Sequence, residues 1–290
     1  MDIRALTLFL NLADTLHFGR ASELSHISPS ALSRAIKQLE ESVGVALFER
    51  NNRTVVLTYE GEKFRDYARD TVMQWGVIRD ELMEESGELH GELSVYCSVT
   101  ASYSFLYDIL SEFRLNHPAV EIKLHTGDPD LALSRVVSGA EDISIAAKPE
   151  TLPGGVSFKP IAETPLQFIA PKNADAIDQQ IAASDWANTP MILPETGMGR
   201  QRVEAWFAAQ GMQPTIYAQV AGNEAIVSMV SLGFGVGVVP RIVLDNSPLA
   251  ASVEIINTEP ALEPYEVGLF TLNKKLKSPL TRAFWSLLKP

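Results

Sequence analysis

The chain has 290 residues, of which 46% are hydrophobic, a size and an apolar content that suffice for two or three cores. Its formal net charge of -12 argues against a protein that coats nucleic acid without sequence preference, although residues 1–65 taken alone are neutral and can still present a local basic face. Cys97 is the only cysteine, which excludes an internal disulfide and a cysteine-cluster zinc site.

Two features bear on where the chain resides. The longest apolar runs, such as GFGVGVVP at 233–240, are too short to span a bilayer. The N-terminal stretch is interrupted by Asp2, Arg4, Asn11 and Asp14 and lacks the pattern of a signal peptide. We therefore expect a cytoplasmic protein with no membrane partner.

Residues 1–58 are expected to form the first domain. Apolar spacing predicts helices near 6–13, 19–27 and 28–43, and VALFERNNRTVVLT at 45–58 contains two strand-like runs around asparagines that tolerate turns. Helix, turn, helix and β-wing is the outline of a winged helix-turn-helix DNA-binding domain.

The third helix of this domain has two unlike faces. Ser28 suits the N-cap and Pro29 the first turn. An apolar stripe, which predicts burial, consists of Leu32, Ala35, Ile36 and Leu39. The opposite face carries Ser30, Ser33, Arg34 and Lys37. Short hydroxyls permit close approach to DNA and arginine can address a guanine or a phosphate, so this face suits a major groove, whereas an ordinary solvated face is the alternative.

Phosphate contacts are expected from three further arginines, Arg20, Arg50 and Arg53, at the second helix and around the wing. The complete set predicted to contact DNA is Arg20, Ser28, Pro29, Ser30, Ser33, Arg34, Lys37, Arg50 and Arg53.

Residues 59–90 are expected to form one long linker helix. Its apolar positions step by four and three, as in a coiled-coil seam, and are Phe64, Ala68, Thr71, Trp75, Ile78 and Leu82. This pattern predicts a dimerisation helix. Packing of the stripe on its own domain is the alternative, because Ala68 and Thr71 are weak seam residues.

Residues 91–290 alternate strand-like and helix-like segments, which predicts parallel sheets covered by helices. The pattern restarts once, so we expect two lobes with a ligand cleft between them. Lobe I would comprise about 91–162 and 266–290, because the last strand and helix could return to it, and lobe II would comprise about 163–265.

Two strand-to-helix loops are candidates for binding a small anion. In lobe I, Ser98, Val99, Thr100, Ala101 and Ser102 follow a strand and would offer hydroxyls and free N–H groups at a helix start. Gly127 and Lys148 follow the next strands. In lobe II the candidates are Glu195, Thr196, Gly197, Arg200 and Arg202. Helix capping by Ser98 and Thr100, and solvation of the two arginines, are the competing interpretations.

The glycine-rich stretch GFGVG at 233–237 superficially resembles a dinucleotide-binding fingerprint. That fingerprint needs a strand before it and a helix after it, whereas here a helix precedes and VVP follows. Tight packing of a helix on a strand explains these glycines better.

The N-terminal zone resembles the LysR-type transcriptional regulators. The matching residues span almost the whole zone and are Phe18, Ala21, Leu24, Ser28, Pro29, Leu32, Ser33, Ile36, Leu39, Glu40, Gly44, Leu47, Phe48, Arg50, Arg53, Leu57, Thr58 and Gly61. The resemblance implies a winged helix-turn-helix joined by a linker helix to a two-lobed α/β effector domain like a periplasmic binding protein. It also implies a homodimer or homotetramer on a double-stranded operator, with RNA polymerase as a further candidate partner.

The C-terminal zone is similar to one branch of that family, which activates the ketol-acid reductoisomerase (acetohydroxy acid isomeroreductase) gene of branched-chain amino-acid synthesis. The similarity rests on CSVTASYSFL, HPAVEIKLHTGD, KPETLPGGVSF, NEAIVSMVSLGFGVGVVP and AFW. It implies a 2-hydroxy-3-oxo acid effector, acetolactate or acetohydroxybutyrate, whereas the residues alone indicate only a small anion. A LysR-type regulator of another pathway, responding to a different organic acid, is the alternative.

Two other classes of protein fit the sequence less well. An enzyme would need a catalytic triad, a metal site or a phosphate loop, and no such spacing stands out, so we expect neither catalysis nor a cofactor. A solute-binding protein would match the two-lobed region but would leave residues 1–90 unexplained.

Overall fold

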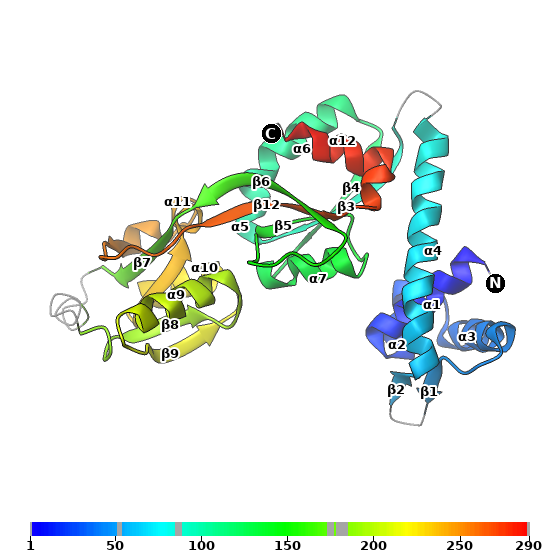
Figure 1. The fold of residues 1–290 in the computed structure, drawn as a ribbon, viewed down its shortest axis with the longest axis horizontal. Coiled ribbons are helices and arrows are strands. Elements are labelled where there is room, and N and C mark those ends of the chain that lie inside the picture. Colours follow the sequence, from blue (N-terminus) through cyan, green and yellow to red (C-terminus); the bar gives the residue numbers. More distant parts are fainter. Residues whose placement is uncertain (1, 51–53, 85–88, 173–176, 178–184, 289–290) are drawn as a thin grey trace. The chain divides into compact units, whose positions relative to one another are not determined.

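The computed structural model describes residues 2–50, 54–84, 89–172, 177 and 185–288. The chain folds as two compact units, Met1–Gly87 and Glu88–Pro290 (Figure 1). Among the described residues, no helix combines the length and hydropathy that a membrane span requires.

The N-terminal unit is a small helical core with a two-stranded wing. An antiparallel pairing joins β1 to β2, with Phe48 opposite Leu57. The core collects Leu6, Phe9 and Leu12 of the first helix against the third helix and Phe48 of the wing. The elements are α1 (Ile3–Thr15), α2 (Phe18–Leu24), α3 (Pro29–Val43), β1 (Phe48–Arg50), β2 (Val55–Leu57) and α4 (Tyr59–Glu84).

Local sequence signals set the ends of α3. The Ser28 side chain accepts a hydrogen bond from the backbone N–H of Ala31, and Pro29 occupies the first turn, where its missing N–H is not needed. Gly44 ends the helix at φ +85, a conformation that suits a residue without a Cβ. The winged helix-turn-helix predicted for this unit is confirmed.

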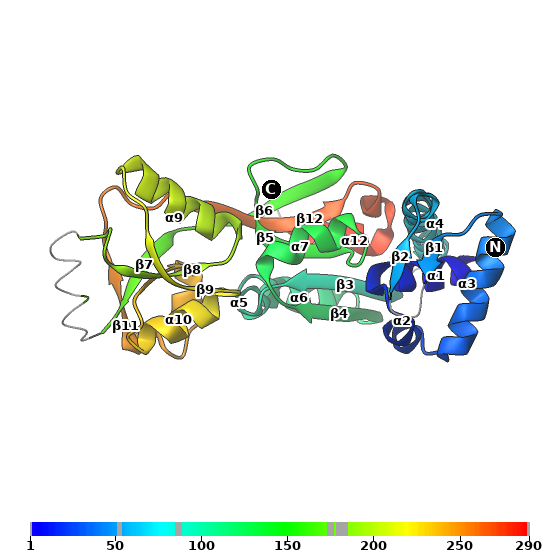
Figure 2. The ribbon, with the colours of Figure 1, turned by 90° about the horizontal axis from the view of Figure 1, so that it is seen from below.

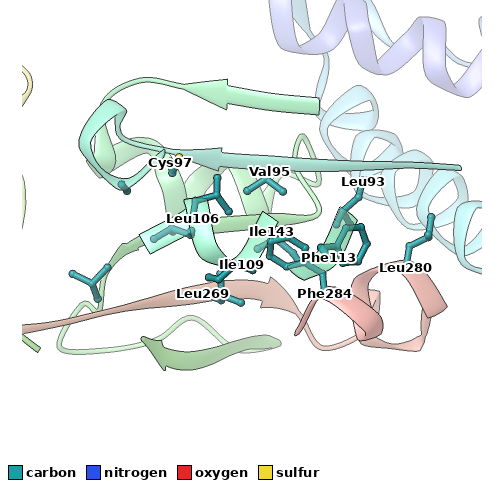
Figure 3. Packing of buried hydrophobic residues seen from close by; sticks show 13 residues of the cluster. Leu93, Val95, Cys97, Leu106, Ile109, Phe113, Ile143, Leu269, Leu280 and Phe284 are labelled. Carbon is teal, nitrogen blue, oxygen red and sulfur yellow. The ribbon is translucent and has the colours of Figure 1, made fainter. Parts of the chain in front are cut away.

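Lobe I of the second unit is a five-stranded sheet in the order β4-β3-β5-β12-β6. Alternate residues of β3, Leu93, Val95 and Cys97, point toward α6 and α12 and form one core with them (Figure 3). Phe113 and Phe284 join these two helices, with ring centroids 5.2 Å apart. The elements are β3 (Gly91–Cys97), α5 (Val99–Tyr103), α6 (Phe105–Asn116), β4 (Val120–Thr126), η1 (Pro129–Leu131), α7 (Ala132–Val137), β5 (Ile143–Ala147), β6 (Val156–Thr164), β12 (Tyr265–Leu272), η3 (Lys275–Lys277) and α12 (Pro279–Leu287).

Lobe II is a second five-stranded sheet, in the order β11-β7-β10-β8-β9, with α9 and α10 on opposite faces (Figure 2). Successive side chains of β10 point to opposite faces of the sheet. Val238 therefore packs in one core with Trp206 of α9, and Val239 packs in the other core with Ile226 of α10. The elements are β7 (Leu166–Pro171), β8 (Pro190–Pro194), α9 (Gly197–Ala209), β9 (Thr215–Val220), α10 (Asn223–Ser231), β10 (Val236–Pro240), α11 (Arg241–Asp245), η2 (Ala250–Ser252) and β11 (Val253–Ile256).

The chain passes between the lobes twice, once from β6 into β7 and once from β11 back to β12. β12 lies between β5 and β6 and runs antiparallel to both. Both sheets are therefore mixed rather than purely parallel, because a strand that returns from the other lobe enters its sheet in the opposite direction.

Gly237 of β10 explains part of the glycine-rich stretch at 233–237. A Cβ at this position would lie 2.5 Å from Ile226 Cγ2 and 2.8 Å from Val230 Cγ2, both on α10. The glycine allows helix and strand to pack closely, as the sequence analysis expected.

Candidate functional site

The outer face of α3 is free of the rest of its unit. Leu32, Ile36 and Leu39 of the apolar stripe are fully or almost fully buried, while Ser30, Ser33, Arg34 and Lys37 are exposed. Lys37 lies 3.7 Å from Glu41, but both side chains are mostly exposed, so this pair restrains the lysine only weakly. The helix therefore presents hydroxyls and cations on the face opposite its anchor.

Ser28 and Pro29, at the start of α3, also stabilise this end of the helix. The Ser28 hydroxyl accepts the Ala31 N–H at 3.2 Å and also lies 3.1 Å from the Ser30 hydroxyl. Ser28 and Pro29 thus set where the helix begins, which fixes the direction of the side chains that follow.

The arginines predicted to hold phosphates differ in their surroundings. Arg20 is exposed near the start of α2. Arg50 forms an ion pair with Glu40 and lies 5.4 Å from the centroid of the Phe18 ring. Arg53 lies outside the described residues.

Glu40 is a residue to which the sequence analysis gave no role. One of its carboxylate oxygens accepts the backbone N–H groups of Leu47 at 2.9 Å and Phe48 at 3.1 Å, while the other pairs with Arg50. A single carboxylate on α3 therefore holds the start of the wing. The interaction could not be read from periodicity, because it joins a helix side chain to backbone seven and eight positions away.

The predicted seam of α4 divides into two parts. Ala68 is buried and Phe64 packs edge-on against Phe9 of α1, so this end of the stripe belongs to the core of its own unit. Thr71 is half-buried, and its hydroxyl donates to the Tyr67 carbonyl. Trp75, Ile78 and Leu82 are 48%, 49% and 65% exposed and form the part of the stripe that remains open.

A cavity of about 380 Å³ lies between lobes I and II. Six of the predicted effector residues line it: Ser98, Thr100, Ala101, Glu195, Thr196 and Gly197. The two strand-to-helix loops, nearly 100 residues apart in sequence, thus meet at one cleft.

The other six predicted effector residues are not among those that line the cavity. Val99 and Ser102 belong to α5, and the Ser102 hydroxyl donates to the Val99 carbonyl. Gly127 packs beside the Tyr96 hydroxyl. Three cations have other partners: Lys148 pairs with Glu266 at 2.8 Å, Arg200 with Glu204 at 2.6 Å and Arg202 with Glu263 at 2.8 Å.

The cleft is acidic. Asp128, Asp130 and Glu195 line it, and among the lining residues that the structure describes none is Lys, Arg or His. Burial raises the pKa of Asp130, a hydrogen bond from Thr196 opposes that rise, and the charge of Asp128 adds to it. Burial also raises the pKa of Tyr265, with a contribution from the charge of Asp130.

Two hydrogen-bonded carboxylates cross the cleft, and neither was predicted from the sequence. Glu224 of lobe II accepts hydrogen bonds from Thr100 of lobe I, and Asp130 of lobe I accepts one from Thr196 of lobe II. These pairs are separated by 124 and 66 residues in sequence, so no local pattern could have indicated them. No cluster of three or more His, Cys, Asp or Glu suited to a metal occurs in the described part of the chain.

Two models of known protein families match the chain and show which family it belongs to. Residues 3–62 match the model of the bacterial regulatory helix-turn-helix protein, lysR family. Residues 86–290 match the LysR substrate binding domain. The chain belongs to the LysR family of transcriptional regulators.

Individual relatives and structures agree with this assignment to the LysR family. The chain is 45% identical over 293 residues, 99% of both chains, to the HTH-type transcriptional activator IlvY of Salmonella typhimurium. Two solved structures share the fold: a full-length OxyR variant from Pseudomonas aeruginosa, with a TM-score of 0.65, 23% identity and coverage of 98% of this chain and 94% of that one, and full-length CbnR complexed with its target DNA, with a TM-score of 0.60, 22% identity and coverage of 98% and 97%. The relatives are named regulators of transcription rather than enzymes, and this LysR-family chain is a DNA-binding regulator.

Proposed function

We propose that this regulator activates a gene of branched-chain amino-acid synthesis, that of ketol-acid reductoisomerase, in response to acetolactate or acetohydroxybutyrate. The observation that supports the DNA-binding part most strongly is the outer face of α3, where Ser33, Arg34 and Lys37 are exposed above a buried apolar stripe. Identity of 45% to the activator IlvY over the full length supports the pathway.

In this proposal α3 enters the major groove and Arg34 reads a base edge, while Ser30 and Ser33 allow the helix to approach closely. Ser28 and Pro29 fix the helix start. Arg20 and Arg53 bind phosphates, and Arg50 does so while paired with Glu40. The regulator acts in the cytoplasm.

The working unit is a homodimer or homotetramer. Trp75, Ile78 and Leu82 leave an apolar row exposed on α4, where a second copy of the helix would bury it. A pair of winged domains then binds two-fold-related half-sites. Effector binding between the lobes changes the equilibrium between arrangements of the DNA-binding pair, and RNA polymerase responds to that change.

The effector is placed at the cleft, with its carboxylate on Thr100 and Ser98 and the rest of the molecule toward Thr196 and Gly197. A cavity of about 380 Å³ suits a molecule of this size. The domain boundaries follow the same scheme, with 1–58 for DNA binding, 59–90 for the linker helix and 91–290 for the effector domain.

A regulator of another pathway, answering a different small organic acid, is the second candidate. The acidic lining of the cleft, with Asp128, Asp130 and Glu195, leaves this second candidate open, because it does not single out acetolactate or acetohydroxybutyrate among small organic acids. The two candidates differ in the effector and in the promoter, but not in how α3 binds DNA.

Transcription in vitro from the ketol-acid reductoisomerase promoter of the same organism tests the proposal. The purified chain should raise transcription when acetolactate is added, and Thr100→Val should blunt this response while leaving operator affinity largely unchanged. If wild-type protein binds this promoter but responds to neither acetolactate nor acetohydroxybutyrate, the effector assignment is wrong. If it does not bind the promoter, the pathway assignment is wrong and the second candidate replaces the first.

A further inference from the structure

Glu224 occupies the position on Thr100 where the effector carboxylate is proposed to bind. One oxygen of Glu224, at the first turn of α10 in lobe II, accepts the Thr100 backbone N–H at 3.1 Å and also the Thr100 hydroxyl. Thr100 is only 3% exposed, so its N–H and hydroxyl groups are hardly accessible to solvent or to a second acceptor. The protein thus fills this position with its own carboxylate.

Asp130 makes the reciprocal contact from lobe I to lobe II. Its side chain accepts a hydrogen bond from the Thr196 hydroxyl at the start of α9. Gly197 has φ +86, and a Cβ there would lie 2.1 Å from Asp130 Oδ1, so the contact requires a glycine at this position. Each lobe therefore sends one carboxylate to a threonine of the other.

We propose that Glu224 and Asp130 form a carboxylate latch that holds the two lobes together across the cleft, and that the effector acts by replacing the Glu224 carboxylate on Thr100. The inference rests on the proposed effector site. It deepens that proposal by naming the residue with which the effector competes and the contact that its binding breaks.

Electrostatics supports replacement rather than simple addition. Asp128, Asp130 and Glu195 already line the cavity, and Glu224 adds a fourth carboxylate at its edge. Like charges within a few ångströms disfavour one another, so a further anion is accommodated best if Glu224 leaves. The affinity of the cleft for an acid is then set partly by the free energy needed to release Glu224.

Simple capping of α5 is the rival explanation for the Glu224 contact. The two explanations differ in their dependence on charge, because Gln keeps an acceptor oxygen and the side-chain shape but removes the negative charge. Ser98 already caps α5 by accepting the Ala101 N–H at 3.1 Å, so the helix retains a cap in a Glu224 variant.

The first measurement is the distance between lobe I and lobe II in protein to which no effector has been added. Spin labels on Leu115→Cys in lobe I and Gln210→Cys in lobe II of the full-length chain, diluted with unlabelled protein, report the distance between lobes by double electron–electron resonance. Both positions are exposed. We expect Glu224→Ala, and more so Glu224→Ala with Asp130→Ala, to lengthen and broaden the distance distribution, because these variants offer no acceptor to the two threonines. Glu224→Gln keeps an acceptor but loses the charge-assisted bond, so it should change the distribution less. Glu254→Gln and Asp245→Asn, carboxylates of lobe II that do not line the cleft, should leave it unchanged.

The second measurement is acetolactate affinity by calorimetry, which should rise about tenfold in Glu224→Gln if one repulsive carboxylate is removed. Distances and affinity that both match wild type would overturn the latch. If no variant, nor the wild type, binds acetolactate, the proposed effector is wrong, while the distance measurement still decides whether the latch exists.

Discussion

The basic side chains of the DNA-binding unit differ in their accessibility to DNA. Arg34 and Lys37 are exposed on the outer face of α3, whereas Arg50 forms an ion pair with Glu40 and lies against the Phe18 ring. A free guanidinium can bind two acceptors of a guanine edge at once, but an ammonium acts as a point charge. The same helix can therefore carry one side chain that specifies sequence and another that adds affinity.

Arg34→Ala is expected to weaken binding to the operator by about 1–3 kcal/mol and to weaken binding to random duplex much less, because a base contact is lost. Fluorescence anisotropy with both duplexes, over a range of salt concentrations, measures the difference. Lys37→Ala is the matched control, and it should weaken both duplexes alike and reduce the salt slope by about one. Equal losses on both duplexes for Arg34→Ala would make Arg34 a phosphate contact.

Cys97 is expected to be unreactive in the folded protein. It is fully buried in the core of lobe I, and burial raises the pKa of its thiol to about 12. At pH 8 roughly one thiol in ten thousand is then the reactive thiolate, because each pH unit below the pKa reduces that form tenfold. Ellman's reagent should label the unfolded chain quickly and the native chain hardly at all. Rapid labelling of native protein would show that lobe I opens.

At the scale of elements, α4 combines two environments along one stripe. Phe64 and Ala68 pack on α1, and Trp75, Ile78 and Leu82 stay exposed. Packing on its own unit, the alternative interpretation of the seam, holds for Phe64 and Ala68, while dimerisation through Trp75, Ile78 and Leu82 stays a prediction. Sequence spacing could place all these residues on one face but could not tell which of them would meet their own unit.

Substitutions at the two parts of α4 should therefore act differently. Ile78→Lys should weaken self-association, measured by sedimentation, while leaving the thermal unfolding of the winged unit near wild type. Phe64→Ala should destabilise that unit by roughly 3 kcal/mol, because a partly buried ring that packs edge-on against Phe9 is lost. Gln74→Lys, an exposed position off the stripe, is the control. Association unchanged by Ile78→Lys would place the dimer contact elsewhere.

The elements that the sequence predicted well are those with local signals. α3 has a cap, a proline at its first turn, an apolar stripe and a terminal glycine, all within 17 residues of each other. By contrast β6 was not expected, since it contains Pro160 and lacks clear alternation. It lies at the edge of its sheet, where a missing N–H is tolerated.

At the scale of the whole molecule, the sequence indicated two lobes and the loops that meet between them, but not the chemistry of the cleft. Ser98, Thr100 and Thr196 were found because strand-to-helix loops have a recognisable pattern. Asp130 and Glu224 were missed because their partners lie far away in sequence. Lys148, Arg200 and Arg202 were predicted from their positions after a strand or in a strand-to-helix loop, and the structure gives each a carboxylate partner of its own.

Footprinting of the DNA upstream of the regulated gene, with and without acetolactate, tests the whole account most directly. An oligomer that inserts two copies of α3 should protect two half-sites related by a two-fold axis, about one helical turn or a multiple of it apart. Acetolactate should change the spacing or extent of that protection. Protection of a single site without two-fold symmetry, or none at all, would contradict the account.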